Sequence, residues 1–156
     1  MTDIFTLIIA ILGALGWVPR LCEYLRPKPQ LRINGIRFEI MDTGPTDRLI
    51  IELENKRCVR PAMATNIYCL YVIYKDDGTR LADNHNRTNL IGYLAPGTKY
   101  SAFLDCTKVK YFDAETVNVY IKVYCDEGIT TTKTFKNIDL SKTETRAESR
   151  EKRGEI

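Results

Sequence analysis

Residues 117–125 read VNVYIKVYC, and this stretch decides the predicted fold class of the chain. Valine and isoleucine occupy every second position, and Asn118, Tyr120, Lys122 and Tyr124 stand between them. Strict alternation predicts a β-strand that turns one face to a core and the other to solvent. The same parity places Cys125 on the core face, so the domain around this strand is expected to be a sheet structure.

Similar stretches lie on both sides of this strand, separated by turn residues such as Asp76-Asp77-Gly78 and Ala95-Pro96-Gly97. Residues 62–74 are apolar on both faces, which is typical of a central strand, and Cys69 shares a face there with Ile67, Tyr71 and Ile73. The chain is therefore predicted to be all-β, an antiparallel sandwich of about seven to eight strands. The expected strands are residues 31–33 and 36–40 around an Asn34-Gly35 turn or bulge, 49–54, 62–74, 79–82, 90–94, 100–104, 117–123 and 129–135.

Composition excludes several function classes for this 156-residue chain. The net charge of +3 comes from 23 basic and 20 acidic residues, which gives no case for nucleic-acid binding. Five cysteines without a Cys-x-x-Cys pair, and a single histidine, predict no metal site. A Gly-rich phosphate loop, a nucleophile elbow and an HExxH motif are absent from the sequence. We expect neither a catalytic residue nor a cofactor, so the protein is not predicted to be an enzyme.

Residues 4–18, IFTLIIAILGALGWV, contain no charged side chain and predict an N-terminal transmembrane helix. Fifteen helical residues rise only about 22 Å, short of a hydrocarbon core of about 30 Å, so the span is expected to continue to residue 25. A signal peptide, a buried helix and an in-plane helix remain the alternatives. The membrane-anchor residues are Ile4, Phe5, Leu7, Ile8, Ile9, Ile11, Leu12, Leu15, Trp17 and Val18.

The basic residues that flank this stretch predict a topology. Arg20, Arg26 and Lys28 follow it, and no cation precedes it. The positive-inside rule then places the N-terminus outside and the C-terminal domain in the cytoplasm, a compartment that suits unpaired cysteines. An alternative assignment is that the protein is an extracytoplasmic envelope or surface component. Sugar on the Asn86-Arg87-Thr88 sequon or a Cys69–Cys125 disulfide would support this alternative.

The domain boundaries follow from these patterns: an anchor at residues 1–25, a Pro-rich connector at 26–30, the sandwich at 31–140 and a charged flexible tail at 141–156. In the anchor, Ala10, Gly13 and Ala14 lie on one face at a spacing that lets two helices approach closely. A homo-oligomer formed through the transmembrane helix is therefore one expected assembly.

Several short motifs resemble the prokaryotic immunoglobulin-like sandwiches of the CARDB and late-embryogenesis-abundant type. In that pattern an Asn ends one strand, a small residue opens the next, and a Pro-Gly turn precedes a later strand. The resemblance covers about residues 31–138 and implies that the antiparallel sandwich is immunoglobulin-like, an interaction or spacer module without a catalytic centre. The motifs are Leu53-Glu54-Asn55, Arg60-Pro61-Ala62, Asn66-Ile67, Tyr71-Val72-Ile73, Asp77-Gly78 and Tyr93-Leu94-Ala95-Pro96-Gly97.

The function expected from the sequence is a single-pass, membrane-anchored module that binds or positions another protein, with the lipid bilayer and an unidentified protein as partners. An alternative is a membrane effector whose β-domain senses a small ligand such as a nucleotide. The candidate contact loop consists of Asp83, Asn84, His85, Asn86 and Arg87, because polar loops on a rigid scaffold often carry binding residues.

Overall fold

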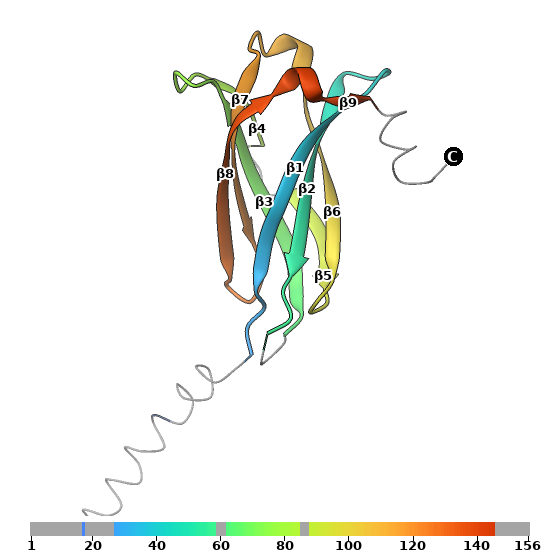
Figure 1. Ribbon diagram of the computed structural model, residues 1–156. Coiled ribbons are helices and arrows are strands. Elements are labelled where there is room, and N and C mark those ends of the chain that lie inside the picture. The colour runs from blue at the N-terminus through green and yellow to red at the C-terminus, as the bar shows by residue number, and fades with distance from the viewer. Residues whose placement is uncertain (1–16, 18–26, 59–61, 85–87, 146–156) are drawn as a thin grey trace, which may run out of the picture.

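A computed structural model describes residues 17, 27–58, 62–84 and 88–145. Two β-sheets pack face to face and form an elongated sandwich (Figure 1). No helix among these residues is long and apolar enough to cross a membrane. The elements are β1 (Leu31–Ile40), β2 (Thr46–Asn55), β3 (Ala64–Tyr74), β4 (Arg80–Asp83), β5 (Thr88–Leu94), β6 (Lys99–Thr107), the 3-10 helix η1 (Val109–Tyr111), β7 (Thr116–Tyr124), β8 (Thr130–Asp139), the 3-10 helix η2 (Leu140–Lys142) and β9 (Glu144–Thr145).

The strand order confirms the predicted all-β sandwich. The first sheet has the order β6-β2-β1-β9, and the second has the order β4-β3-β7-β8, with β5 paired to β3 on the same side as β4. Every pair is antiparallel except the short pair of β1 with β9. Apart from Trp17, the predicted anchor lies outside the described residues, as does most of the predicted tail, so the structure tests the sandwich alone.

Strand β1 runs without a break through the Asn34-Gly35 pair, which forms a bulge and not a turn. The pairing with β2 shifts register between Ile33 and Gly35. A Cβ atom at Gly35 would lie 3.3 Å from Oε2 of Glu52, so the bulge brings the two strands close together there. Most strands also extend beyond their alternating apolar residues, because hydrogen bonding to a neighbouring strand continues into polar positions.

The core lies between the sheets, and the parity prediction for β7 is confirmed. Val117, Val119, Ile121 and Val123 are fully buried. They pack in one cluster with residues of β2 from the other sheet, mainly Leu49, Ile51 and Leu53. This interior is filled by aliphatic side chains, as expected for a sandwich.

Three cysteines contribute to the core as free thiols. Cys69 and Cys125 lie on the core face of the second sheet, as parity predicted, and Cys106 lies on β6. Cys69 faces Val123 across the β3–β7 pair, and no disulfide joins it to Cys125. Burial raises the pKa of Cys69 and of Cys106 to about 12, and that of Cys125 to about 11.

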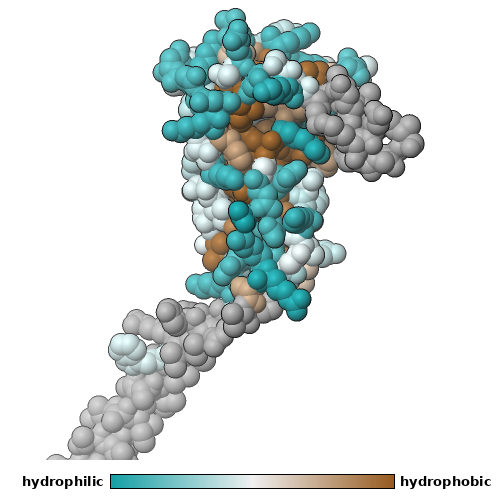
Figure 2. Space-filling model, viewed as in Figure 1, coloured by the Kyte–Doolittle hydropathy of each residue, from teal (hydrophilic) through white to brown (hydrophobic). Residues whose placement is uncertain are grey.

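The open edge of β1 is occupied by side chains of β8. The Thr131 hydroxyl donates to the carbonyl oxygen of Leu31 at 2.8 Å. The Lys133 ammonium donates to the carbonyl oxygens of Ile33 at 3.1 Å and Asn34 at 3.2 Å. Further along β1, the backbone of β9 takes over the pairing. The two sheets are thus closed along this side, apart from an apolar seam that Figure 2 shows in brown on the upper half of the visible face.

Candidate interaction surfaces

The outward face of β3 and β7 is rich in tyrosine, and we call it the tyrosine face. It is formed by half-buried side chains that point away from the core in paired rows. The Tyr68 and Tyr124 rings stack with their centroids 5.7 Å apart. The face consists of Tyr68, Leu70, Val72 and Tyr74 on β3 and of Tyr120, Lys122 and Tyr124 on β7. Apart from Lys122, this part of the sheet presents aromatic and aliphatic groups to solvent.

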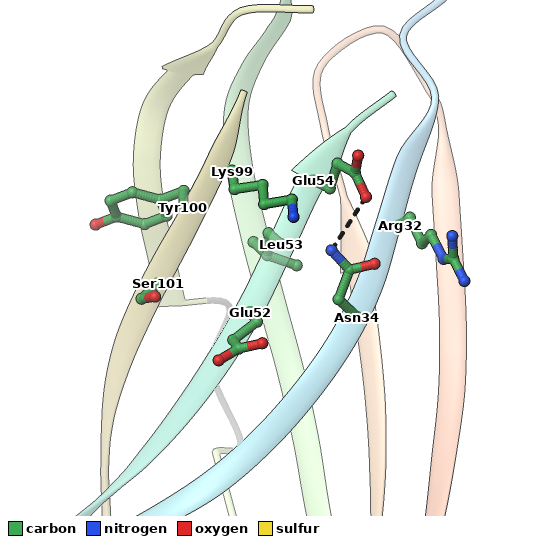
Figure 3. Close-up of a pocket in the computed structure, with 8 residues that line it drawn as sticks. All are labelled: Arg32, Asn34, Glu52, Leu53, Glu54, Lys99, Tyr100 and Ser101. Atoms are coloured by element: carbon green, nitrogen blue, oxygen red, sulfur yellow. Dashed lines mark hydrogen bonds between the residues drawn. The ribbon is translucent and has the colours of Figure 1, made fainter. Parts of the chain in front are cut away.

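The outward face of the other sheet is charged. Glu54 of β2 lies between Arg32 of β1 and Lys99 of β6 in the strand register. The Asn34 side-chain amide donates to Oε2 of Glu54 at 3.1 Å, beside Glu52 (Figure 3). These side chains line a groove of about 590 Å³. Because two carboxylates and two cations meet there, the groove has no excess of either charge.

Asn55 organises the end of the sandwich at which the chain enters β1, which we call the basal end. Its side chain is fully buried. Its Oδ1 accepts the Gln30 amide at 3.1 Å, and its Nδ2 donates to the carbonyl oxygens of Leu94 at 2.8 Å and Ala62 at 2.9 Å. Its backbone carbonyl accepts the Gly97 amide at 2.6 Å. One side chain therefore joins the entry of the chain to three other basal segments.

The predicted connector is partly built into the domain. Pro29 is buried, and the carbonyl oxygen of Gln30 accepts the Lys56 amide at 2.9 Å, in addition to the bond with Asn55. The chain therefore enters the sandwich from Lys28 along a fixed path at the basal end (Figure 1).

Exposed cations and apolar side chains gather at the basal end. We define the basal surface as Lys28, Lys56, Arg57, Met63 and Tyr93, all of which are exposed. Met63 exposes 49% of its surface and Tyr93 exposes 64%. The position that a Cβ of Gly97 would occupy is 3.7 Å from Cβ of Arg57, which places this arginine beside the turn that follows β5.

Two carboxylates also lie at the basal end, on the turn between β7 and β8. Glu127 accepts hydrogen bonds from the Thr65 amide at 3.0 Å and from the Thr65 hydroxyl at 2.5 Å. Burial alone would raise the pKa of Glu127, but these bonds and one from Cys125 hold it below its usual value. Asp126 accepts the Asn66 side-chain amide at 2.5 Å. Both carboxylates therefore hold the turn against the start of β3.

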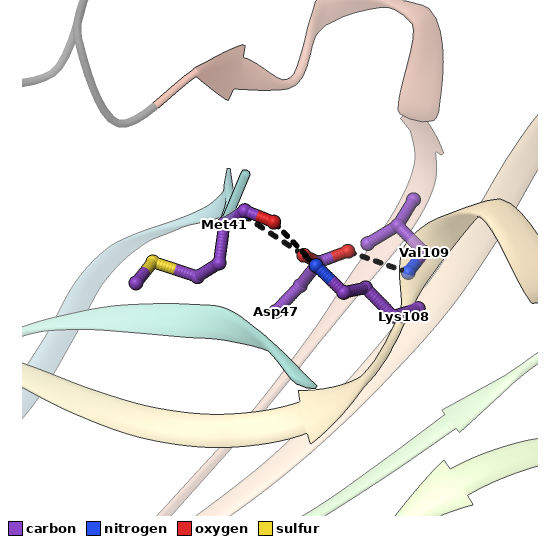
Figure 4. Close-up of polar contacts among 4 residues, drawn as sticks. All are labelled: Met41, Asp47, Lys108 and Val109. Carbon is purple, nitrogen blue, oxygen red and sulfur yellow. Dashed lines mark hydrogen bonds and ion pairs between the residues drawn. The ribbon is translucent and has the colours of Figure 1, made fainter. Parts of the chain in front are cut away.

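A buried ion pair organises the opposite, distal end (Figure 4). Oδ1 of Asp47 accepts the Met41 amide at 2.9 Å, and Oδ2 accepts the Val109 amide at 2.8 Å. The Lys108 ammonium lies 3.1 Å from Oδ1 and also donates to the Met41 carbonyl oxygen. Asp47 is 1% exposed, so the arrangement fixes the distal connections and leaves no open site.

Two members of the predicted contact loop are engaged within the sandwich. The Asn84 side chain accepts the Tyr71 amide at 2.5 Å and donates to the carbonyl oxygen of Cys69 at 2.9 Å. Between β4 and β5, the Asn84 side chain therefore supplies β3 with the hydrogen bonds that the backbone of a neighbouring strand would otherwise supply. Asp83 forms an ion pair with Arg80. The other predicted contact residues, His85, Asn86 and Arg87, lie outside the described residues.

The predicted anchor is represented by one described residue, Trp17, which is helical and exposed. The other anchor residues, the small residues Ala10, Gly13 and Ala14, and the flanking Arg20 and Arg26 lie outside the described part of the chain. Lys28 is described and exposed. Within the described ranges no group of three or more His, Cys, Asp or Glu side chains is placed to hold a metal ion.

Sequence reasoning did not single out Asn55 or the tyrosine face as candidate sites. The motif Leu53-Glu54-Asn55 drew attention to this asparagine only through a family resemblance, and its bonds join residues up to 39 positions apart. The tyrosine face had a signal in the sequence, since residues 62–74 are apolar on both strand faces. That pattern predicted a covered central strand, whereas the outward side chains of β3 are half-buried.

Comparisons with known proteins identify no family for this chain. No protein-family model and no curated protein matches it. Among solved structures, the archaeal flagellum of Methanospirillum hungatei strain JF1 is 12% identical with a TM-score of 0.49, covering 88% of this chain and 82% of that chain. The putative ApaA protein from Bordetella pertussis is 12% identical with a TM-score of 0.44, covering 70% of this chain and 91% of that chain. We base no functional argument on these distant likenesses.

Proposed function

We propose that this protein is a single-pass, membrane-anchored immunoglobulin-like module that binds or positions another protein, and that the tyrosine face is its contact surface. The observation that carries the proposal is the tyrosine face itself. It sets partly exposed aromatic and aliphatic side chains in rows on two neighbouring strands. The proposed anchor is the uncharged stretch at residues 4–18, which precedes the domain.

The strand order supports the immunoglobulin-like assignment. Strands β6, β2 and β1 take the places of strands E, B and A, and β3, β7 and β8 take those of C, F and G. The resemblance to CARDB and late-embryogenesis-abundant sandwiches points the same way and implies an interaction or spacer role. In such a role the fold supplies a rigid scaffold and the outward faces of its sheets supply the specificity.

The composition of the tyrosine face supports a protein as its partner. Tyrosine combines a large apolar ring with a hydroxyl and loses little conformational entropy on contact, so it is enriched at protein interfaces. Lysine is depleted there, and the face carries a single one, Lys122. The other sheet presents Arg32, Glu52 and Glu54, a charged surface that costs more to desolvate.

The nucleotide-sensing alternative has less support in the described residues. A nucleotide would need a cleft in which cations converge on its phosphates. The polar groove on the first sheet contains two cations, Arg32 and Lys99, and also two carboxylates, Glu52 and Glu54, that offset their charge. We therefore rank ligand sensing second to protein binding.

Photo-crosslinking tests the proposed contact surface. A benzoyl-phenylalanine placed at Tyr120 in the full chain, expressed in its native membrane, is expected to give one or a few discrete adducts of higher mass. The same group at Glu52, on the outward face of the other sheet, serves as the matched control and is expected to give none of these adducts. Mass spectrometry of an adduct then identifies the partner.

The identity of the crosslinked protein shows which kind of contact the tyrosine face makes. An adduct between two copies of this chain would make the tyrosine face a homo-oligomer contact, and an adduct with a second protein would identify the positioned partner. Equal crosslinking from Tyr120 and Glu52, or none from Tyr120, would contradict the proposal.

A further inference from the structure

We propose that the basal surface docks on an anionic lipid bilayer, so that the sandwich stands on the membrane and does not swing freely above it. This inference rests on the anchoring part of the proposed function. The basal surface consists of Lys28, Lys56, Arg57, Met63 and Tyr93, as defined above. Its occupant would be the bilayer that holds the anchor.

The path of the chain brings this surface to the membrane. The uncharged stretch ends at Val18, ten residues before Lys28, and the chain is built into the sandwich from Pro29 onward. The bond between the Gln30 amide and Asn55 and the burial of Pro29 leave little freedom at the junction. Any segment anchored before Lys28 is therefore joined to the sandwich at the basal end.

The chemistry of the basal surface fits lipid headgroups. Lys56 and Arg57 follow β2 directly and are exposed, which suits contact with lipid phosphates. Met63 and Tyr93 lie on the neighbouring segments that open β3 and close β5, where Ala64 pairs with Leu94. Exposed cations beside an exposed thioether and a phenol ring are typical of surfaces that insert into the interfacial layer of a bilayer.

Charge differs between the two ends of the sandwich. The basal carboxylates, Asp126 and Glu127, accept hydrogen bonds from Asn66 and Thr65, and they share a hollow with Lys28. The distal end carries more exposed acidic groups than the basal end. The distal end also exposes the cations Arg80, Lys110 and Lys142. Since exposed carboxylates surround them, an anionic bilayer would attract the basal end more strongly than the distal end. The exposed distal carboxylates are Asp42, Asp76, Asp77, Asp113 and Glu115.

Docking in this orientation has a consequence for the tyrosine face. The strands run between the basal and distal ends, so a docked sandwich holds its strands steeply to the membrane (Figure 1). Tyr68 and Tyr120 would then point sideways, toward neighbouring proteins in the same membrane. The basal contact would thus set the direction in which the module presents its partner surface.

Quenching of a fluorescent amino acid by spin-labelled lipid headgroups tests the docking. The full chain is reconstituted into vesicles of phosphatidylcholine with about 30% phosphatidylserine, with the fluorophore at Met63 or, as a matched distal position, at Asp77. Quenching at Met63 is expected to exceed quenching at Asp77 several-fold, and 0.5 M salt is expected to reduce it. Each lipid-facing cation contributes roughly a fivefold preference, so Lys56→Glu with Arg57→Glu should lower the ratio of docked to undocked chains at least tenfold.

A distal charge reversal, Lys110→Glu with Lys142→Glu, controls for the change in net charge and is expected to leave quenching at Met63 unchanged. Equal quenching at Met63 and Asp77, or no response to the basal reversal, would overturn the docking. Flotation with the vesicles separates the two proposals: a chain that floats without quenching at Met63 retains its anchor and loses only the docking. A chain that does not float contradicts the anchoring and, with it, the docking.

Discussion

The side chain of Asn55 accepts the backbone amide of Gln30 at 3.1 Å, which joins the last residue before β1 to the last residue of β2. Because the same side chain donates to Leu94 and Ala62, it links the entry of the chain to the segments around β3 and β5. The basal end is therefore a single hydrogen-bonded unit, and its geometry depends on one amide.

Asn55→Ala is expected to destabilise the domain by about 2–4 kcal/mol, because the buried Leu94 carbonyl and the partly buried Gln30 amide and Ala62 carbonyl would lose their partner. Urea unfolding followed by fluorescence measures the change. Asn89→Ala, at an exposed position of β5, serves as the control and should stay within about 0.5 kcal/mol of the wild type. A loss for Asn55→Ala no larger than that of the control would contradict the role of the amide.

Asp47→Ala is expected to cost about 3–5 kcal/mol, because the Lys108 ammonium would remain buried without its counter-charge. The double variant Asp47→Ala with Lys108→Met should recover part of this loss, since it removes the unpaired charge. Chemical denaturation of the two variants measures both values. Lys142→Ala, which breaks an exposed pair with Asp139, is the control and should cost under about 1 kcal/mol. A double variant no more stable than the single one would contradict the ion-pair explanation.

The buried thiols predict a loss of stability at alkaline pH. The folded state holds the pKa of Cys69 and of Cys106 at about 12, above their value in the unfolded chain. The folded state therefore binds more protons from about pH 9 upward, and each thiol can lower the unfolding free energy by about 1.4 kcal/mol per pH unit. The contribution of these two thiols to the unfolding free energy is complete below pH 9 and declines as the pH rises toward 12.

A pair of variants isolates the contribution of the thiols. Cys69→Ala with Cys106→Ala should lower stability at pH 7 but show a shallower decline between pH 9 and 11 in urea titrations. Leu104→Ala, a core truncation without a titrating group, should lower stability equally at every pH. Parallel pH profiles for both variants would contradict the prediction.

Glu127→Gln is expected to destabilise the domain by about 1 kcal/mol at pH 7, because the charged carboxylate accepts the Thr65 amide and hydroxyl. The pKa of Glu127 is lowered in the folded state, so its contribution is present above the unfolded-state pKa and is lost as pH falls below about 4.5. Denaturation at pH 7 and pH 3 should therefore show a larger difference from wild type at pH 7 than at pH 3. Exposed Glu115→Gln, the control, should change neither value.

Local patterns in the sequence sufficed to predict the sheets but not the surfaces. Val119 and Ile121 revealed the core face of β7 because strand periodicity is a local property. Asn84, by contrast, resembled an ordinary loop residue, and only the fold shows its side chain bonded to Tyr71. The basal bonds of Asn55 depend likewise on loops brought together by strand pairing, which no window of the sequence contains.

The capped edge of β1 bears on how the protein behaves when it is crowded. An anchor would concentrate many copies in two dimensions, where unpaired strand edges nucleate fibrous aggregates. Thr131 and Lys133 already occupy the carbonyl groups at the start of β1, and β9 pairs with the far end of the same strand. Copies that collide through this side therefore find little backbone to pair with, which lowers the tendency of this edge to polymerise at high local density.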